Sequence, residues 1–142
     1  MEKLSNNTIK TFQKLFTGYT KAYGTFDINK PDNEKKMKGK ALTVREKINY
    51  EHYENHLNGK QGIGVVPIKD DNHNIVFCVL DIDDYDLAQE ELLRKIDDCK
   101  IPFLLCLSKS GGYHLYLFFE EDTSAQLIQK PLRKVAKYLG YP

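Results

Sequence analysis

The 142-residue sequence contains little cysteine, no long apolar run and almost no excess charge. Its three cysteines, Cys78, Cys99 and Cys106, show neither a CxxC motif nor a Cys/His spacing suited to a metal. This usage predicts reduced, buried thiols in a cytoplasmic protein and argues against a disulfide framework. No signal peptide is recognisable, and no stretch of about 18 apolar residues is present, so we expect no membrane segment.

The net charge of +1 excludes a general basic field over the whole molecule. A nucleic-acid partner would therefore have to be held by a local basic patch. Residues 28–40 form a lysine-rich polar loop. This loop is either a solvated surface segment or a contact for a phosphate backbone.

Apolar periodicity predicts four helices, over residues 8–16, 44–57, 86–101 and 124–140. Runs of β-forming residues predict four strands, over residues 62–69, 74–83, 102–110 and 113–119.

Local signals add detail to these elements. Asn7 or Thr8 is expected to cap the first helix, Thr43 and Glu46 form a capping box for the second, and Asp86 caps the third. Residues 70–73 are predicted to be a hairpin turn between two strands. The remaining signals are Pro67, which indicates an edge strand, and Pro131, which indicates a kink or a restart of the last helix.

From residue 75 onward the predicted order is strand, helix, strand, strand, helix. A ferredoxin-like (RRM-like) βαββαβ unit has this order with one further strand. We therefore expect an α+β fold in which an RRM-like core lacks its last strand and follows an N-terminal α/β unit. Residues 1–61 would be a helical unit with the basic loop, and residues 62–142 the β-sheet core, within a single compact domain.

Two carboxylates end the apolar run "VFCVLDID". In a strand, Asp81 and Asp83 project to the same side, roughly 7 Å apart. Such a pair is costly unless a cation lies between its members, and oxygen ligands favour Mg²⁺ or Mn²⁺. Alternatively, the two aspartates mark a solvated strand end.

A polar turn precedes the strand "YHLYLFF". Strand alternation puts His114, Tyr116 and Phe118 on one face. Taken alone, His114 is either a hydrogen-bonded structural histidine or a ligand-binding one. The turn favours a ligand, because Gly111 and Gly112 permit close approach of backbone N–H groups. Hydroxyls and a positive charge that suit a triphosphate come from the remaining turn residues, Ser108, Lys109 and Ser110.

The stretches "VLDIDDYD" and "LSKSGGYHLYLFF" together resemble the first two motifs of the archaeo-eukaryotic primase (primase-polymerase) superfamily. The likeness extends to residues 56–83, which are similar to primases of the TOTE conflict-system type and their phage and plasmid relatives. It covers most of residues 12–142. The turn "SGGYH" is one residue shorter than the SGxGxH form common in relatives.

The resemblance implies roles for the residues that match the motifs. Asp81 and Asp83 would hold catalytic Mg²⁺ or Mn²⁺, and His114, Ser108 and Ser110 would contact the phosphates of a nucleoside triphosphate. Lys109 and Lys60 would contact phosphate or template. Single-stranded DNA template would lie along basic residues, with stacking by Tyr19 or Tyr23; these basic residues are Lys35, Lys36, Lys38, Lys40, Arg45 and Lys60.

A third family motif, an aspartate on a later strand, is expected beyond the last predicted helix, where the sequence ends at Pro142. The implied activity is nucleotide addition on a single-stranded template, in the cytoplasm of a bacterium or of a phage-infected host, with a fused or associated helicase as a further partner. Two alternatives stay open. One is a non-catalytic nucleotide or nucleic-acid binding module, and the other is a metal-dependent phosphatase of the type that also begins with a DxD strand.

Overall fold

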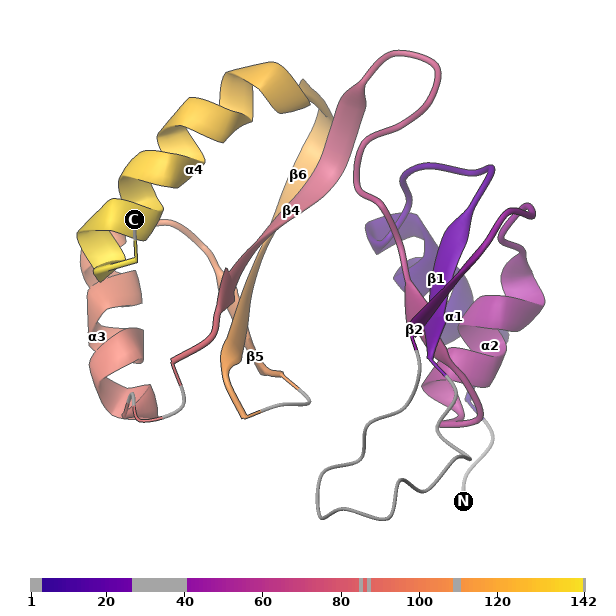
Figure 1. Cartoon of the computed structure of the whole chain (residues 1–142), viewed down its shortest axis with the longest axis horizontal. Coiled ribbons are helices and arrows are strands. Elements are labelled where there is room, and N and C mark those ends of the chain that lie inside the picture. Colours follow the sequence, from indigo (N-terminus) through magenta and orange to yellow (C-terminus); the bar gives the residue numbers. More distant parts are fainter. Residues whose placement is uncertain (1–3, 27–40, 85, 87, 109–110, 142) are drawn as a thin grey trace. The chain divides into compact units, whose positions relative to one another are not determined.

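The computed structural model describes residues 4–26, 41–84, 86, 88–108 and 111–141. The chain divides into two compact units, Met1–His73 and Asn74–Pro142, and each contains one three-stranded antiparallel sheet (Figure 1). Two helices belong to each unit, so the expected α+β class is confirmed. No helix in these described ranges is long and apolar enough to cross a membrane.

The first unit begins with helix α1 (Asn6–Leu15). Its N-cap is Ser5, whose Oγ accepts a hydrogen bond from the Thr8 backbone N–H at 3.1 Å, so the expected cap at Asn7 or Thr8 was wrong. Ile9 is the buried residue of the helix. The Tyr53 hydroxyl donates to the Phe16 carbonyl at 3.0 Å, which ties the next helix to the end of α1.

Helix α2 (Tyr50–Leu57) begins six residues later than its periodicity predicted. Its capping box is formed by Asn49 and His52, in place of the expected Thr43 and Glu46. Residues Ala41–Val44 form strand β2 instead. The C-terminal end of α2 at Leu57 is confirmed, since Asn58 is the C-cap and Gly59 follows with φ of 70°.

The sheet of the first unit has the order β2-β1-β3. Strand β1 (Tyr23–Phe26) pairs on one side with β2 and on the other with β3 (Gly62–Gly64). Strand β3 is therefore an edge strand, as Pro67 indicated, although Pro67 itself follows the strand. The predicted hairpin across residues 70–73 is wrong, because β3 pairs with β1 and not with the strand that follows residue 73.

The second unit has the predicted order of elements, β4-α3-β5-β6-α4. Their bounds are Asn74–Ile82, Gln89–Cys99, Leu104–Leu107, Tyr113–Ser124 and Ala125–Leu139. Strand β6 lies in the middle of the sheet, antiparallel to β4 on one side and to β5 on the other. Both helices cover the same face of this sheet (Figure 1).

The N-cap of helix α3 and the course of helix α4 at Pro131 are the features that the sequence signals addressed. Helix α3 has Ala88 as its N-cap without a side-chain hydrogen bond, so the expected Asp86 cap was wrong. Helix α4 contains Pro131 and runs without interruption past it.

The core of the second unit follows the alternation of the strands. Ile82, Tyr113 and Leu115 point to the covered face and are buried. They pack with residues from the helices, which are Leu92, Ile96 and Leu139. Asp81 precedes Ile82 on β4, and His114 lies between Tyr113 and Leu115 on β6, so both lie on the face that α3 and α4 leave uncovered.

The three cysteines are free thiols. Cys78 on β4 is 7% exposed, and burial raises the pKa of its thiol from 9.0 to about 11. The folded state thus favours the neutral thiol. The stability that the folded protein gains from burying this neutral thiol is lost as the pH rises from 9 through 11.

We predict that iodoacetamide at pH 8 labels Cys78 only after unfolding, because the thiolate is the reactive form and the folded protein suppresses it. Half-buried Cys106 serves as the internal comparison. Peptide mass spectrometry of native and urea-unfolded protein measures both. Labelling of native Cys78 at the rate of Cys106 would contradict the placement of Cys78 in the core.

Candidate functional site

The end of β4 and the start of β6 bring the two sequence motifs together. Asp81 pairs directly with His114 in the strand register. The Nε2 atom of His114 lies 3.2 Å from Oδ1 of Asp81. The Asp81 side chain is 60% exposed and that of His114 is 33% exposed, so both remain accessible to a ligand.

Tyr116 lies beside His114 on the same face of the sheet. Its hydroxyl is 3.4 Å from Nδ1 of His114, and the two rings meet edge to face with centroids 5.9 Å apart. Burial raises the pKa of the Tyr116 phenol, and electrostatic interactions with Cys106 and Asp81 raise it further. The phenol therefore stays protonated at neutral pH, and its hydroxyl lies within hydrogen-bonding distance of Nδ1 of His114.

The same face continues across the sheet and along β6. Cys106 on β5 pairs with His114, so Cys106, His114 and Asp81 form a row across three strands. Along β6, the Tyr116 and Phe118 rings stack with centroids 6.2 Å apart. Strand alternation identified this face, but no sequence pattern indicated that Tyr116 contacts His114.

The turn between β5 and β6 lies against the end of β4. The Ser108 backbone N–H donates to the Gly112 carbonyl at 2.8 Å, and the Gly111 N–H donates to the Ser108 carbonyl at 3.2 Å. Gly111 has φ of 100°, which favours glycine. A Cβ at Gly112 would lie 2.3 Å from the Ile82 carbonyl oxygen, so only glycine allows the two backbones to approach. Two predicted phosphate-binding residues, Lys109 and Ser110, lie outside the described residues.

The three aspartates within residues 81–84 have different surroundings. Asp84 serves the fold: Oδ1 accepts from the Asp86 N–H at 3.2 Å and Oδ2 accepts from the Tyr141 hydroxyl at 3.1 Å. Asp81 and Asp83 are exposed. These two, the predicted metal ligands, are the carboxylates that the strand end presents to solvent.

Asp81 and Asp83 can supply only part of the coordination shell of a hard divalent cation, and waters or substrate phosphates would have to complete it. The described part of the chain contains no cluster of three or more His, Cys, Asp or Glu side chains that could hold a metal. Mg²⁺ typically uses one or two carboxylates and completes its coordination with waters and substrate phosphates. The carboxylates of Asp81 and Asp83 are suited to that arrangement.

The residues predicted to contact nucleic acid belong to the first unit. Arg45 and Lys60 are both exposed there, and Lys40, with Lys35, Lys36 and Lys38, lies outside the described residues. Tyr23 is only 6% exposed, and its hydroxyl lies 2.8 Å from Nε2 of His52. The expected stacking by Tyr23 is therefore wrong, since its ring belongs to the core.

The comparison with protein families decides the identity of the domain. Residues 10–139 match the family described as TOTE conflict system, Archaeo-Eukaryotic Primase domain. The chain belongs to this family. Among curated proteins, a search found none that matches the chain. The match spans both units of this primase domain, so the resemblance carried by "VLDIDDYD" and "LSKSGGYHLYLFF" is confirmed at the level of the family.

We predict that Gly112→Ala destabilises the primase domain by roughly 1–3 kcal/mol, because the added methyl group overlaps the Ile82 carbonyl. Urea unfolding measures the change. Gly24→Ala is the matched control, since a Cβ there would meet its nearest neighbour at an ordinary 3.5 Å. Equal stability of the two variants would show that the turn does not lie against the end of β4.

We also predict that Asp81→Asn lowers the pKa of Tyr116 partway toward its ordinary value, because the substitution removes a negative charge and leaves the burial in place. The ¹³C resonance of the ring Cζ, followed against pH, reports this titration. Asp97→Asn, on the exposed end of α3, should leave it unchanged. An identical Tyr116 titration in wild type and Asp81→Asn would rule out the proximity of the two groups.

Proposed function

We propose that this primase domain adds nucleotides to a strand paired with a single-stranded DNA template, using Mg²⁺ or Mn²⁺. The observation that carries the proposal is the direct pairing of exposed Asp81 with His114 beside the Ser108–Gly112 turn. A carboxylate that can bind a cation and an imidazole that can bind phosphate are then close enough to contact the same nucleotide. Family membership supports the same conclusion.

Each residue of the site has a proposed task. Asp81 and Asp83 hold the cation through their exposed carboxylates, and the cation, when bound, stabilises negative charge on the phosphates. His114 would donate from Nε2 to a phosphate oxygen of the bound nucleotide. The hydroxyl of Ser108, together with Ser110 and Lys109, orients the triphosphate.

The reaction is a displacement at the α-phosphorus of the nucleoside triphosphate. The 3′-oxygen of the growing strand forms a bond to that phosphorus and gives its proton to water, and the bond between that phosphorus and the pyrophosphate breaks, so that pyrophosphate leaves. Alignment of the two oxygens is the main contribution expected from His114 and the turn, because positioning alone can supply a large part of such a rate enhancement.

The fold of the second unit also supports the proposal. In β4-β6-β5 the first strand lies beside the third, and both helices cover one face. RRM-like sheets also place their first strand beside their third, and they keep one face available for nucleotides. We propose that this unit is the RRM-like catalytic core of the primase domain.

The deciding experiment is primer extension on single-stranded DNA with Mn²⁺ or Mg²⁺ and labelled nucleotides. Wild-type protein should extend, and Asp81→Asn with Asp83→Asn should abolish extension because the cation is lost. The matched control is Asp97→Asn with Asp98→Asn, which removes two exposed carboxylates from α3 and should retain activity.

Nucleotide binding separates the remaining candidates. His114→Ala should weaken metal-dependent triphosphate binding by roughly 10- to 100-fold, which is typical for loss of a hydrogen bond to a charged group. Binding lost in His114→Ala without any extension by wild type would indicate a binding module. Phosphate release without template would indicate a phosphatase. Binding and turnover that are indifferent to all three substitutions would refute the site.

A further inference from the structure

The two ring nitrogens of His114 have different partners. Nε2 lies 3.2 Å from Oδ1 of Asp81, and Nδ1 lies 3.4 Å from the hydroxyl oxygen of Tyr116. A half-turn of the imidazole about its bond to Cβ would put carbon atoms in the places of both nitrogens, and both contacts would be lost. The two partners together therefore favour one orientation of the ring, in which Nε2 faces Asp81.

The same two partners also favour one tautomer of the neutral ring. A carboxylate accepts hydrogen bonds and does not donate them, so the contact with Asp81 places the proton on Nε2. A neutral imidazole has a single N–H, and Nδ1 is then an acceptor. The hydroxyl of Tyr116 supplies the matching donor, because burial raises the pKa of this phenol and keeps it protonated at neutral pH.

Tyr116 is itself held by its neighbours on the sheet. Its ring stacks on that of Phe118, with centroids 6.2 Å apart and an angle of 18° between the planes. The ring of Phe77, which is 3% exposed, has its centroid 6.5 Å away. In the strand register Tyr116 lies between Val79 on β4 and Leu104 on β5. A ring packed in this way keeps its hydroxyl in one place, as a residue that supports a binding site must do.

We propose that Tyr116 is a positioning residue for His114 and directs Nε2 toward the phosphates of the bound nucleotide. This inference rests on the proposed function, which assigns Nε2 to a phosphate oxygen. Nε2 would then exchange its contact with Asp81 for one with the nucleotide. The contact with Tyr116 is made at Nδ1 and stays in place, so Tyr116 is the partner that orients the ring while the nucleotide is bound.

The test is a double-mutant cycle on the affinity for ATP and for dATP, measured by calorimetry with Mn²⁺ present. Tyr116→Phe keeps the ring and removes the hydroxyl, and it should weaken binding to the wild-type background roughly 3- to 10-fold, as expected for one hydrogen bond. In the His114→Ala background the same substitution should change nothing, because Tyr116 acts through His114.

The ¹⁵N chemical shifts of the His114 ring, measured at pH 8 without nucleotide, report which nitrogen carries the proton. Wild-type protein should show the proton on Nε2, and Tyr116→Phe should populate the tautomer with the proton on Nδ1. A tyrosine that only fills space on the sheet would leave these shifts unchanged when its hydroxyl is removed.

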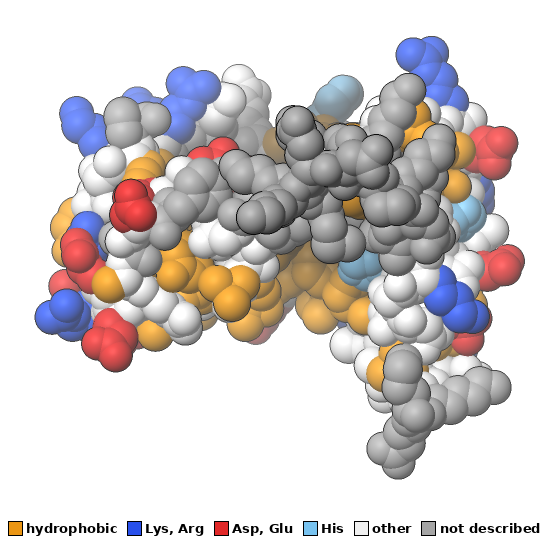
Figure 2. Space-filling model, turned by 60° about the horizontal axis from the view of Figure 1, so that its bottom comes forward, with side chains coloured by type: hydrophobic (Ala, Val, Ile, Leu, Met, Phe, Trp, Pro, Cys, Tyr) orange, Lys and Arg blue, Asp and Glu red, His pale blue; other side chains and the backbone are white. Residues whose placement is uncertain are grey.

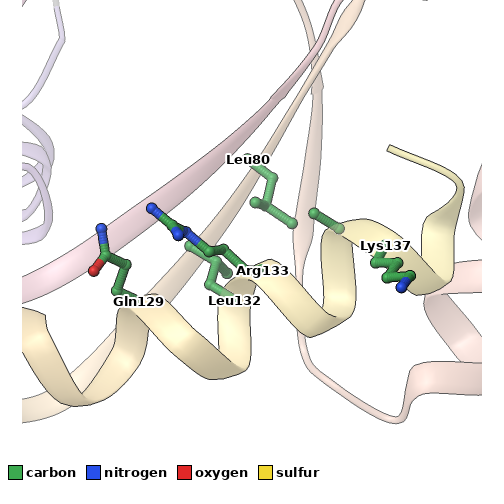
Figure 3. A pocket seen from close by; sticks show the side chains of 6 residues that line it. Leu80, Gln129, Leu132, Arg133 and Lys137 are labelled. Atoms are coloured by element: carbon green, nitrogen blue, oxygen red, sulfur yellow. The ribbon is translucent and has the colours of Figure 1, made fainter. Parts of the chain in front are cut away.

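Two control variants alter residues of α4, which covers the opposite face of the sheet. Tyr138→Phe is the matched control, because it removes a hydroxyl from a side chain that is 59% exposed. Arg133→Gln with Lys137→Gln removes two of the cations that Figure 3 shows on α4. Both controls should leave the nucleotide affinity and the His114 shifts unchanged, and urea unfolding checks that Tyr116→Phe is folded.

The outcomes separate this inference from the proposed function. Affinity lost in His114→Ala but unchanged in Tyr116→Phe would overturn the positioning role and leave the proposed function intact. An equal loss from Tyr116→Phe in both backgrounds would also overturn it, and would mean that the hydroxyl contacts the nucleotide directly. If His114→Ala binds both nucleotides as wild type does, the proposed function fails, and the ¹⁵N shifts alone decide whether Tyr116 orients the ring.

Discussion

The antiparallel pairing of β4 with β6 is the constraint on which the second unit depends. It places Asp81 opposite His114 and Ile82 opposite Tyr113. Because neighbouring residues of a strand point to opposite faces, one register simultaneously buries the Ile82–Tyr113 pair and exposes the Asp81–His114 pair. A slip of one residue would bury a carboxylate and an imidazole, which is costly, so the core protects the geometry of the site.

Glycine and tyrosine complete that geometry in different ways. Gly112 lets the start of β6 approach the end of β4, which holds the Ser108–Gly112 turn beside the aspartates. Tyr116 holds the His114 ring from the other side through its hydroxyl and the edge of its ring. The site is therefore built on a rigid sheet edge, while its polar atoms are left open to the exterior, as an exchangeable ligand requires. Exposed side chains of several kinds occur on the surface of the chain (Figure 2).

The sequence predicted the second unit better than the first, for physical reasons. The strands β4 and β6, of nine and twelve residues, and the amphipathic helix α3 between them carry clear signals for the second unit, and they also identified Asp81 and His114. The first unit has strands of three and four residues, too short for a periodic signal. The apolar pattern of residues 44–57 is typical of one long helix. Val44, however, belongs to the segment Ala41–Val44, which pairs with β1 through backbone hydrogen bonds, so tertiary pairing overrides local propensity there.

The central claim is that Asp81 and Asp83 hold a divalent cation next to the turn that binds the triphosphate. Paramagnetic broadening by Mn²⁺, measured on backbone amide signals in the presence of a nucleoside triphosphate, tests it most directly. The account predicts that Mn²⁺ broadens the signals of Asp81, Asp83 and residues 108–114 first, and that Asp81→Asn with Asp83→Asn removes the effect. Broadening that is centred on other carboxylates, such as Asp97 and Asp98, or that persists in that variant, would contradict the account.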